Sequence, residues 1–403
     1  MRTNVFVFNA SFWAPVRRSI YWWLFRWQPK ILARFFSDNY AKILPYHTGE
    51  EDVKKVQLLL SPESIDLPPY LPSKEVAPFW SPPWFYHRLD RRSVEHIETG
   101  NVFIFPEGIQ VSEWGISERP LMYPSEKRTL TPYYVLKKRL EVKHIIPVHQ
   151  VLHLHNRWSY NNYFHWITET LNRYMLWLET TTDPQIPLVL PEQVPSFVLE
   201  SVRLLHPTQK FIFLPTDALL FAQKCSYVDQ YYMSPSILKR LVQNIKHRLD
   251  QPKPKNKSLR RLFISRKMAS ARRILNEDAL APILAKFDIE VICLENYSFE
   301  AQVQLCQEAH LLIGTHGAGL TNGIFMPEGS QVIEITTKDI LQPPNLRYCY
   351  FSLISSMNLH YEAFLAQSNE EQELQADLWV SSESLEALLM QILTKDHVQY
   401  RLA

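Results

Sequence analysis

Glycine is rare in this chain of 403 residues, and its uneven placement constrains the fold more than any other feature. Five of the nine glycines lie between Gly314 and Gly329. The apolar run 311–313 before them is typical of a short buried strand, and the small residues after it indicate a tight turn that opens into a helix at 319–325. The sequence therefore predicts a strand, a turn and a helix at this point.

This turn has the chemistry of an anion site. Glycine lets a ligand approach the backbone closely, and the first amide groups of a helix lack intrahelical partners at its positive end. Such a turn favours a phosphate. His316 lies in the turn and can donate a hydrogen bond or a proton to that phosphate. The alternative is a structural turn in which His316 has no chemical role.

Composition limits the classes of protein that remain. The length exceeds what one hydrophobic core usually organises, so two domains are expected, and 46% apolar residues support a real core. A net charge of +2 argues against a nucleic-acid partner, so any basic site must be local. No two of the four cysteines have Cys-x-x-Cys spacing, which favours neither a zinc site nor a disulfide scaffold and fits a reducing, cytoplasmic location.

The N-terminal residues 1–95 are expected to form an arm and a proline-rich connector. In 12–36, aromatic and basic residues alternate, which suits peripheral contact with the inner face of a membrane. The segment is too short and too charged to span a bilayer, and no apolar run elsewhere is long enough. The alternative is an arm packed on its own protein. Prolines then mark 61–85 as irregular.

Residues 96–250 read as a Rossmann-like acceptor domain. The expected strands are 101–105, 145–154, 186–190 and 211–214, and the expected helices are 161–179, 195–205 and 235–250. Alternation of this kind predicts a parallel sheet with crossover helices. The polar, proline-containing segment 251–257 is the expected linker between domains.

Residues 258–403 read as a second Rossmann-like domain with a terminal helix at 385–394. The expected strands are 262–265, 290–294 and 331–336, and the expected helices are 277–287, capped by Asn276, and 299–308, capped by Ser298. In open sheets ligands bind beyond the carboxyl ends of strands, which places the turns after Ser265 and Ile313 on one rim. The predicted fold is α/β, with two doubly wound domains facing across a cleft.

The turn after Ser265 is basic. Seven Lys and Arg residues and no acidic residue occur between 257 and 273. Arginine presents a planar fork that matches phosphate oxygens, so Arg266 and Arg273 facing the His316 turn would form a diphosphate site without a metal. No Asp-x-Asp pair is present to hold a divalent ion. A solvated basic surface is the alternative.

The helix expected at 161–179 carries ionisable side chains at four-residue steps. His165, Glu169 and Arg173 share a stripe that is separate from the apolar face of the helix. His165 or Glu169 can act as a general base. The alternative is that His165 is a hydrogen-bonded core residue and that Glu169 pairs with Arg173.

Three sets of motifs resemble glycosyltransferase family 61, in that family's order and within residues 100–365. They are 163–171 (YFHWITETL), 263–266 with 272–278, and 316–322 (HGAGLTN) with 332–334. The resemblance implies a GT-B fold, inverting transfer from a nucleotide sugar and donor binding in the C-terminal domain. Members transfer xylose, arabinose or N-acetylglucosamine to glycans, and bacterial ones are associated with capsular or surface polysaccharide. One departure is Asn172, where the family often has proline.

The resemblance implies roles for individual residues. The donor, expected to be a UDP-sugar, would contact Arg266, Arg273, Asn276, His316, Gly317, Ala318, Gly319, Asn322 and Glu334. His165 and Glu169 are the catalytic candidates, with a glycan as acceptor. No metal and no cofactor are expected. Glu334 at a strand end can bind the ribose or cap a neighbouring turn.

Other classes of protein remain as alternatives. A glycan-binding or scaffold protein with a decayed transferase fold would lack turnover. A dinucleotide-dependent oxidoreductase is disfavoured because Gly323 lies one residue too far from Gly319 for the G-x-G-x-x-G pattern and the expected acid is absent. An esterase would need a G-x-S-x-G elbow, which the sequence lacks.

Overall fold

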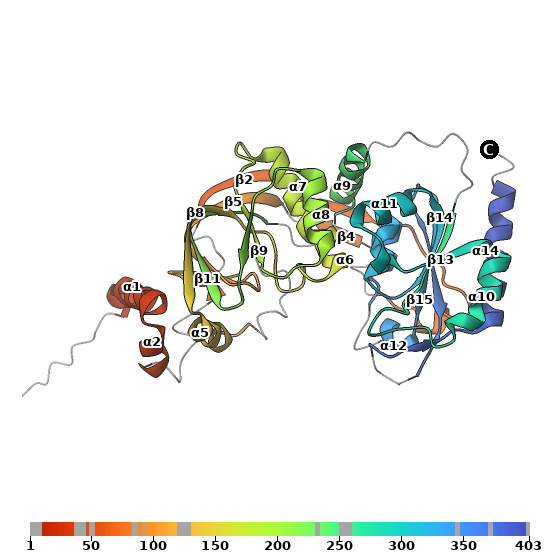
Figure 1. Ribbon diagram of the computed structural model, residues 1–403, viewed down its shortest axis with the longest axis horizontal. Helices are drawn as coiled ribbons and strands as arrows, with labels where there is room; N and C mark the ends of the chain where they lie inside the picture. The colour runs from red at the N-terminus through yellow and green to blue at the C-terminus, as the bar shows by residue number, and fades with distance from the viewer. Residues whose placement is uncertain are drawn as a thin grey trace, which may run out of the picture.

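The computed structural model describes residues 10–35, 46–47, 53–82, 88–91, 93–118, 130–229, 234–249, 260–342, 347–369 and 374–399. The described residues form a mixed α/β protein in which two sheets lie side by side along the long axis of the molecule (Figure 1). The α/β class expected from the sequence is confirmed. The arrangement of two domains facing across a cleft stays a prediction.

The first sheet joins nine described strands in the order β1-β7-β6-β5-β11-β8-β9-β10, with β2 beside β5. Its strands are β1 (Tyr46–His47), β2 (Val53–Leu60), β5 (Val94–Ile104), β6 (Gln110–Ser112), β7 (Gly115–Ser117), β8 (His144–Leu152), β9 (Leu188–Pro191), β10 (Phe211–Leu214) and β11 (Ala218–Asp229). The first half of the chain consists of this sheet and the helices connected to it. These helices are α5 (Pro132–Glu141), α6 (Tyr163–His165), α7 (Leu171–Thr180), α8 (Ser196–Leu205) and α9 (Pro235–Arg248).

Only part of this sheet is parallel. β11, β8, β9 and β10 pair in parallel, as expected from the alternation of strands and helices. β5 runs antiparallel to β11, β6 and β2, so the expectation of a Rossmann-like doubly wound first domain is wrong for this part of the sheet. For β6 the reason is local, because Gly108 adopts φ +85° and closes a tight turn that sends β6 back along β5, whereas the pairing of β5 with β11 is long-range. β2 also precedes the boundary expected at residue 95.

The second sheet is parallel throughout, in the order β13-β12-β14-β15-β16. Its strands are β12 (Arg260–Ile264), β13 (Ile289–Ile292), β14 (Ala309–Thr315), β15 (Gln331–Thr336) and β16 (His360–Leu365). Its helices are α10 (Glu277–Lys286), α11 (Phe299–Gln307), α12 (Lys338–Leu341), α13 (Cys349–Ser356) and α14 (Ser382–Gln399). The doubly wound pattern expected for this half is confirmed.

Chain order reverses between β12 and β14, and that point is where ligands bind in open α/β sheets. The strand and turn expected around Gly314 are found there. The helix that follows is a 3₁₀ helix, η5 (Ala318–Phe325), and not an α-helix. Two caps were expected nearby. The Ser298 hydroxyl accepts from the amide of Ala301 as predicted, whereas Asn276 makes no capping bond.

The proline-rich segment packs on the second half of the chain. The Tyr70 hydroxyl donates to Glu362 at 3.0 Å, and the Trp80 ring lies edge-on to Tyr348 with centroids 4.8 Å apart. Residues of both halves also share one hydrophobic core cluster. The halves are therefore packed together and are not joined only by a linker. The expected linker 251–257 lies outside the described residues.

At the N-terminus, α1 (Ala10–Trp27) and α2 (Pro29–Phe35) lie against the first half, at the end of the molecule opposite α14 (Figure 1). Phe25 and Leu32 are buried in a cluster with Phe103 and Val135. The expected alternative of an arm packed on its own protein thus holds for one side of these helices. Within the described part of the chain, none of the helices is long and apolar enough to cross a membrane.

Candidate active site

The turn after β14 brings a histidine, a buried carboxylate and a tyrosine into one chain of contacts. His316 follows β14 directly, and its Nδ1 bonds Oε1 of Glu334 from the neighbouring β15. The Tyr361 hydroxyl on β16 donates to the other oxygen of Glu334 at 2.6 Å. All three side chains are buried. Glu334 and Tyr361 therefore fix the imidazole orientation through Nδ1, which leaves Nε2 as the ring nitrogen that could contact a ligand.

Glu334 fills neither of the two roles expected from the sequence. It is 1% exposed, and both of its carboxylate oxygens are engaged by side chains. A carboxylate so placed cannot reach a ribose without leaving two buried donors unpaired. In the described residues, Glu334 links the Tyr361 hydroxyl to the His316 imidazole.

Arg266 lies against the glycine turn. A Cβ on Gly317 would come within 2.7 Å of its Nη1, so the missing side chain lets the guanidinium approach the turn. Its Nε and Nη2 donate to the carbonyl of Ala271 at 3.1 and 2.9 Å. The sequence expectation that Arg266 faces the His316 turn agrees with this placement. Gly319 instead allows packing, because a Cβ there would lie 3.1 Å from Leu294.

Arg272 is the partner that sequence reasoning missed. It has φ +55°, which is unusual for arginine, and this backbone turn directs it toward Arg266 and Tyr350. Its Nε is buried and has no hydrogen-bond partner within the described residues. Burial lowers the pKa of both guanidinium groups, and the charge of Arg266 lowers the pKa of Arg272 further. Two half-buried cations thus lie close together.

Arg273, which was expected in this place, points elsewhere. Its Nη2 and Nε donate to Oδ2 of Asp377 at 2.6 and 3.0 Å, and its backbone amide donates to Oδ1. The guanidinium is half exposed and carries its own counter-ion. Of two adjacent arginines, the structure therefore brings Arg272 and not Arg273 to Arg266.

Asn276 and Asn322 have structural contacts. The Asn276 amide exchanges two hydrogen bonds with the backbone of Val380, at 2.7 and 3.0 Å, which explains why it does not cap α10. Asn322 on η5 accepts a bond from the Tyr163 hydroxyl at 2.6 Å and donates to Gln302. Asn322 thereby ties the glycine turn to α6 of the other half. Ala318 begins η5 and packs at the edge of the shared core.

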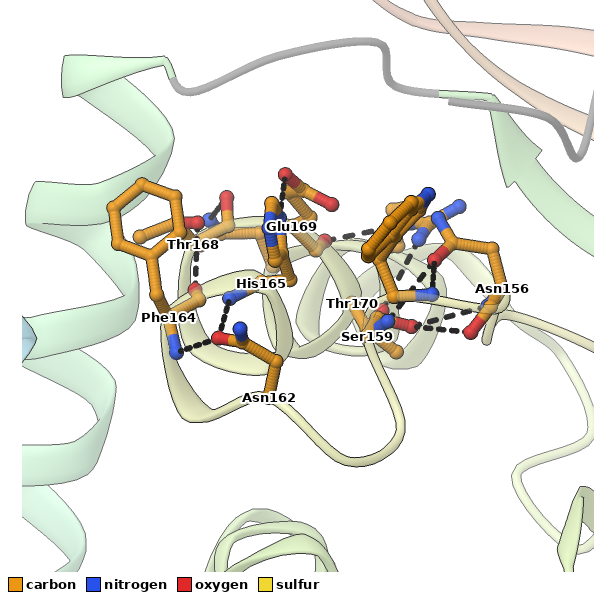
Figure 2. Close-up of polar contacts among 11 residues, drawn as sticks. Asn156, Ser159, Asn162, Phe164, His165, Thr168, Glu169 and Thr170 are labelled. Carbon is orange, nitrogen blue, oxygen red and sulfur yellow. Dashed lines mark hydrogen bonds and ion pairs between the residues drawn. The ribbon is translucent and has the colours of Figure 1, made fainter. Parts of the chain in front are cut away.

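A second histidine and carboxylate pair lies on the helix of the first half. The Asn162 side chain caps α6 by accepting from the amides of Phe164 and His165 (Figure 2). The chain then passes through a π turn, η3 (Trp166–Thr170), into α7. His165 Nδ1 lies 2.8 Å from Oε1 of Glu169, which is 2% exposed (Figure 2). Single π turns inside helices are frequent at functional sites.

The loop before α6 is held in place by its own side chains. Oδ1 of Asn156 accepts from the amides of Trp158 and Ser159, at 2.9 and 3.0 Å (Figure 2). This loop leaves the carboxyl end of β8, a strand of the parallel part of the first sheet. Arg173, expected on the same stripe as Glu169, donates to the Glu169 backbone carbonyl and to the Thr170 hydroxyl.

The two pairs are connected by aromatic rings. The Phe164 ring lies 5.5 Å from that of Tyr350 on α13, and the Tyr350 ring lies 5.1 Å from the imidazole of His316, measured between centroids. We call Tyr163, Phe164, Asn322 and Tyr350 the joint. Through the joint, the helical turn that precedes Glu169 and carries His165 packs on η5 and α13 beside His316. Tyr350 and Tyr361 gave no signal in the sequence beyond being aromatic.

In the described part of the chain, no group of three His, Cys, Asp or Glu side chains is arranged to hold a metal ion. The candidate site comprises two histidine and carboxylate pairs, the arginine pair Arg266 and Arg272, and a glycine turn at the switch point of the second sheet. Side chains of these types can transfer a proton and bind an anion.

Comparison with known proteins finds a family match. Residues 163–333 match the family described as Glycosyltransferase 61. The matched region includes His165, Glu169, Arg266, Arg272 and His316. The match is to the same family that the motifs resembled, and Glu334, Tyr350 and Tyr361 lie beyond the matched region.

Curated relatives give the same class. The chain is 34% identical over 124 residues to the EGF domain-specific O-linked N-acetylglucosamine transferase of Drosophila melanogaster, covering 30% of this chain and 22% of the relative. It is 32% identical over 108 residues to protein O-linked-mannose beta-1,4-N-acetylglucosaminyltransferase 2 of Tetraodon nigroviridis, covering 26% and 18%. The matches therefore span about a fifth of the length of these relatives.

Proposed function

We propose that this protein transfers a sugar from a nucleotide-sugar donor, a UDP-sugar, to a glycan acceptor, with inversion at the anomeric carbon. The observation that carries the proposal is the Arg266 and Arg272 pair. Both guanidinium groups are half-buried, they repel each other, and Nε of Arg272 is buried without a hydrogen-bond partner among the described residues. Glu295, Asp377 and Glu334 offset part of this positive charge from a distance, and a diphosphate would add paired N–H···O bonds to it.

His316 is placed to act on the same diphosphate. Because Glu334 holds Nδ1, Nε2 can donate to a phosphate oxygen, and the buried carboxylate keeps the ring oriented for that contact. Charge develops on the leaving diphosphate as the glycosidic bond breaks. Donors that are already in position when this happens stabilise the transition state most. We assign this role to Arg266, Arg272 and His316.

The acceptor hydroxyl needs a base on the opposite face of the sugar. Between the two candidates, we favour His165. Its side chain is 20% exposed, whereas Glu169 is buried and bonded to Nδ1 of His165. Glu169 then orients the ring through Nδ1, and Nε2 of His165 takes the proton. A positioned base of this kind is typically worth about 10² to 10⁴ in rate.

The expected metal independence is part of the proposal. It is supported by the missing Asp-x-Asp pair and by the arginines, which supply the positive charge that a divalent ion supplies elsewhere. Turnover should therefore continue in EDTA. Loss of turnover in EDTA together with its return on adding manganese would contradict this part of the proposal.

Arg272 and Arg273, which are neighbours in the sequence, give a matched test of the diphosphate site. Arg272→Ala should weaken binding of a nucleoside diphosphate by about tenfold or more, because charge-assisted bonds contribute about 1.5–3 kcal/mol each. Arg273→Ala removes the same charge from the next residue, but the Arg273 side chain is already paired with Asp377. We therefore expect a smaller loss of affinity. Isothermal titration calorimetry with UDP measures both. Equal losses, or a larger loss for Arg273→Ala, would contradict the assignment.

The donor sugar and the acceptor are separate questions. Both relatives above are named as N-acetylglucosamine transferases, so UDP-N-acetylglucosamine is the first donor to test. We propose a glycan of a surface polysaccharide as acceptor, whereas the relatives are named for transfer to EGF domains and to O-linked mannose. Mass spectrometry of products from an array of donors and acceptors distinguishes these classes. Donor binding without any turnover across the array would support the scaffold alternative.

A further inference from the structure

The helices α1 and α2 present two very different sides. One side is fixed to the protein: Phe25 and Leu32 are 1% and 0% exposed, and the Phe25 ring lies 5.8 Å from Phe103. Arg139 on α5 donates to the backbone carbonyls of Phe25 and Arg26, at 2.9 and 2.7 Å. The orientation of α1 on the sheet is therefore set by burial and by hydrogen bonds.

The opposite side of the two helices is apolar and open to solvent. Trp23 and Trp27 are 54% and 57% exposed, and Ile20 and Ile31 are 49% and 41% exposed. At about 100° per residue, Ile20, Trp23 and Trp27 fall within an arc of about 60°, directly away from the buried Phe25. Isolated exposed apolar side chains are normal, but a continuous group with two indoles marks an interaction surface. We call these four side chains the indole face.

Two cationic side chains lie at the edge of the indole face. Residues 10–35 contain no Asp or Glu. Lys30 is exposed between Trp27 and Ile31, and the Arg26 guanidinium lies between the Trp27 ring, at 4.9 Å from its centre, and the Phe221 ring, at 4.2 Å. Arg18 contacts the protein instead, because its guanidinium stacks 3.4 Å from the centre of the Trp114 ring. An apolar surface that is bordered by cations and lacks acidic residues is complementary to a partner that is negatively charged at its surface and apolar beneath it.

We propose that the indole face binds the interfacial layer of a membrane that contains anionic lipids. Indole rings favour the level of the lipid headgroups, where the ring is apolar and the N–H remains hydrated. Lys30 and Arg26 would contact the negatively charged headgroups. The helices would lie in the plane of the interface, because their other side is committed to the protein core. The inference does not depend on the transferase chemistry.

Vesicle sedimentation with the full chain tests the proposal. The protein should sediment with vesicles of phosphatidylcholine mixed with phosphatidylglycerol, and much less with phosphatidylcholine alone. The double variant Trp23→Ala and Trp27→Ala should have a partition coefficient lower by about tenfold or more, because each substitution removes apolar area that the membrane would bury. Lys30→Ala should lower it by about fivefold, and added salt should weaken binding.

Trp379 provides the matched control. It is 53% exposed, like the two indoles, but it lies on β18 (Leu378–Trp379) in the second half of the chain. Trp379→Ala should leave vesicle binding unchanged. Thermal unfolding of the double variant should match the parent chain, because Trp23 and Trp27 contribute little to the core.

Three results would overturn the proposal. The first is absence of binding to the anionic vesicles. The second is equal binding by the parent chain and the double variant. The third is self-association without lipid, seen by sedimentation velocity and abolished in the double variant, which would show that the indole face joins two copies of the chain.

Discussion

Replacing Tyr361 by phenylalanine tests whether Glu334 orients His316. The change removes one hydroxyl and keeps the ring, which packs against Tyr70 and Phe351 with centroids 5.4 and 5.7 Å apart. Burial and then the Glu334 carboxylate raise the pKa of Tyr361 well above its usual value. The hydroxyl therefore stays protonated in the folded protein and acts as a donor at every working pH.

The magnitude follows from the environment of the lost bond. The Tyr361 hydroxyl is 2.6 Å from a carboxylate oxygen of Glu334, which is 1% exposed. Water cannot easily replace the donor at such a site. Hydrogen bonds to charged groups contribute about 1.5–3 kcal/mol, so we expect the free energy of unfolding to fall by about 2 kcal/mol. A carboxylate held by one partner in place of two also lets the imidazole rotate, and small misplacements of this kind lower rates by about tenfold to a hundredfold.

Two measurements are needed on the same variant. Thermal unfolding gives the loss of stability, and steady-state kinetics with a nucleotide-sugar donor give kcat/KM. Tyr70→Phe is the matched control, because it also removes a largely buried hydroxyl bonded to a carboxylate, at 3.0 Å from Glu362. The Tyr70 hydroxyl donates to Glu362 and not to Glu334, so this control should lose stability and keep the rate.

The reasoning would be refuted by either of two results. If Tyr361→Phe keeps the parent kcat/KM and donor affinity, Glu334 does not orient a functional histidine. If Tyr70→Phe loses as much activity as Tyr361→Phe, the effect spreads through the packing of the proline-rich segment and not through the carboxylate.

Further predictions concern the turns and the buried histidines. Gly317→Ala should weaken UDP binding in calorimetry with little loss of stability, because the new Cβ would lie 2.7 Å from the flexible end of Arg266. Gly108→Ala should lower the unfolding temperature by several degrees in calorimetry, since it combines φ +85° with a contact of 2.6 Å to the His155 carbonyl. Burial lowers the pKa of His155 from 6.5 to about 4, so the unfolded chain binds more protons between these values. Stability is thus full above pH 6.5 and should fall by roughly 3 kcal/mol by pH 4, which urea unfolding at a series of pH values can measure.

The second half of the chain was predicted well because its signals are local. Each strand of a buried parallel sheet is a short apolar run, and each is followed by a helix with its own start signal. β15 begins and ends as expected. The first half was predicted only in part, because β5 pairs with β11 across more than a hundred residues, for example Cys225 with Thr99. No local pattern indicates such a partner.

The site shows the same division. The four-residue step of His165 and Glu169 lies within one helix, and the sequence therefore placed the pair correctly on one stripe. The choice between Arg272 and Arg273 depends on one positive φ value, which arginine rarely adopts and no sequence pattern indicates. The contact of Tyr361 with Glu334 depends on which strand pairs with β15, and β16 was not among the expected strands.

The joint gives these separate observations a common physical basis. One histidine and carboxylate pair lies on each half of the chain, and the proposed transfer reaction would need both at fixed separation. The contacts that set this separation are buried: the Tyr163 to Asn322 hydrogen bond at 2.6 Å and the ring contacts of Phe164 with Tyr350 and of Tyr350 with His316. The same residues that hold the two halves together thus lie next to the proposed reacting groups on both sides. A change in the packing of the halves would therefore alter both pairs together, and the stability of this contact and the geometry of the site are coupled.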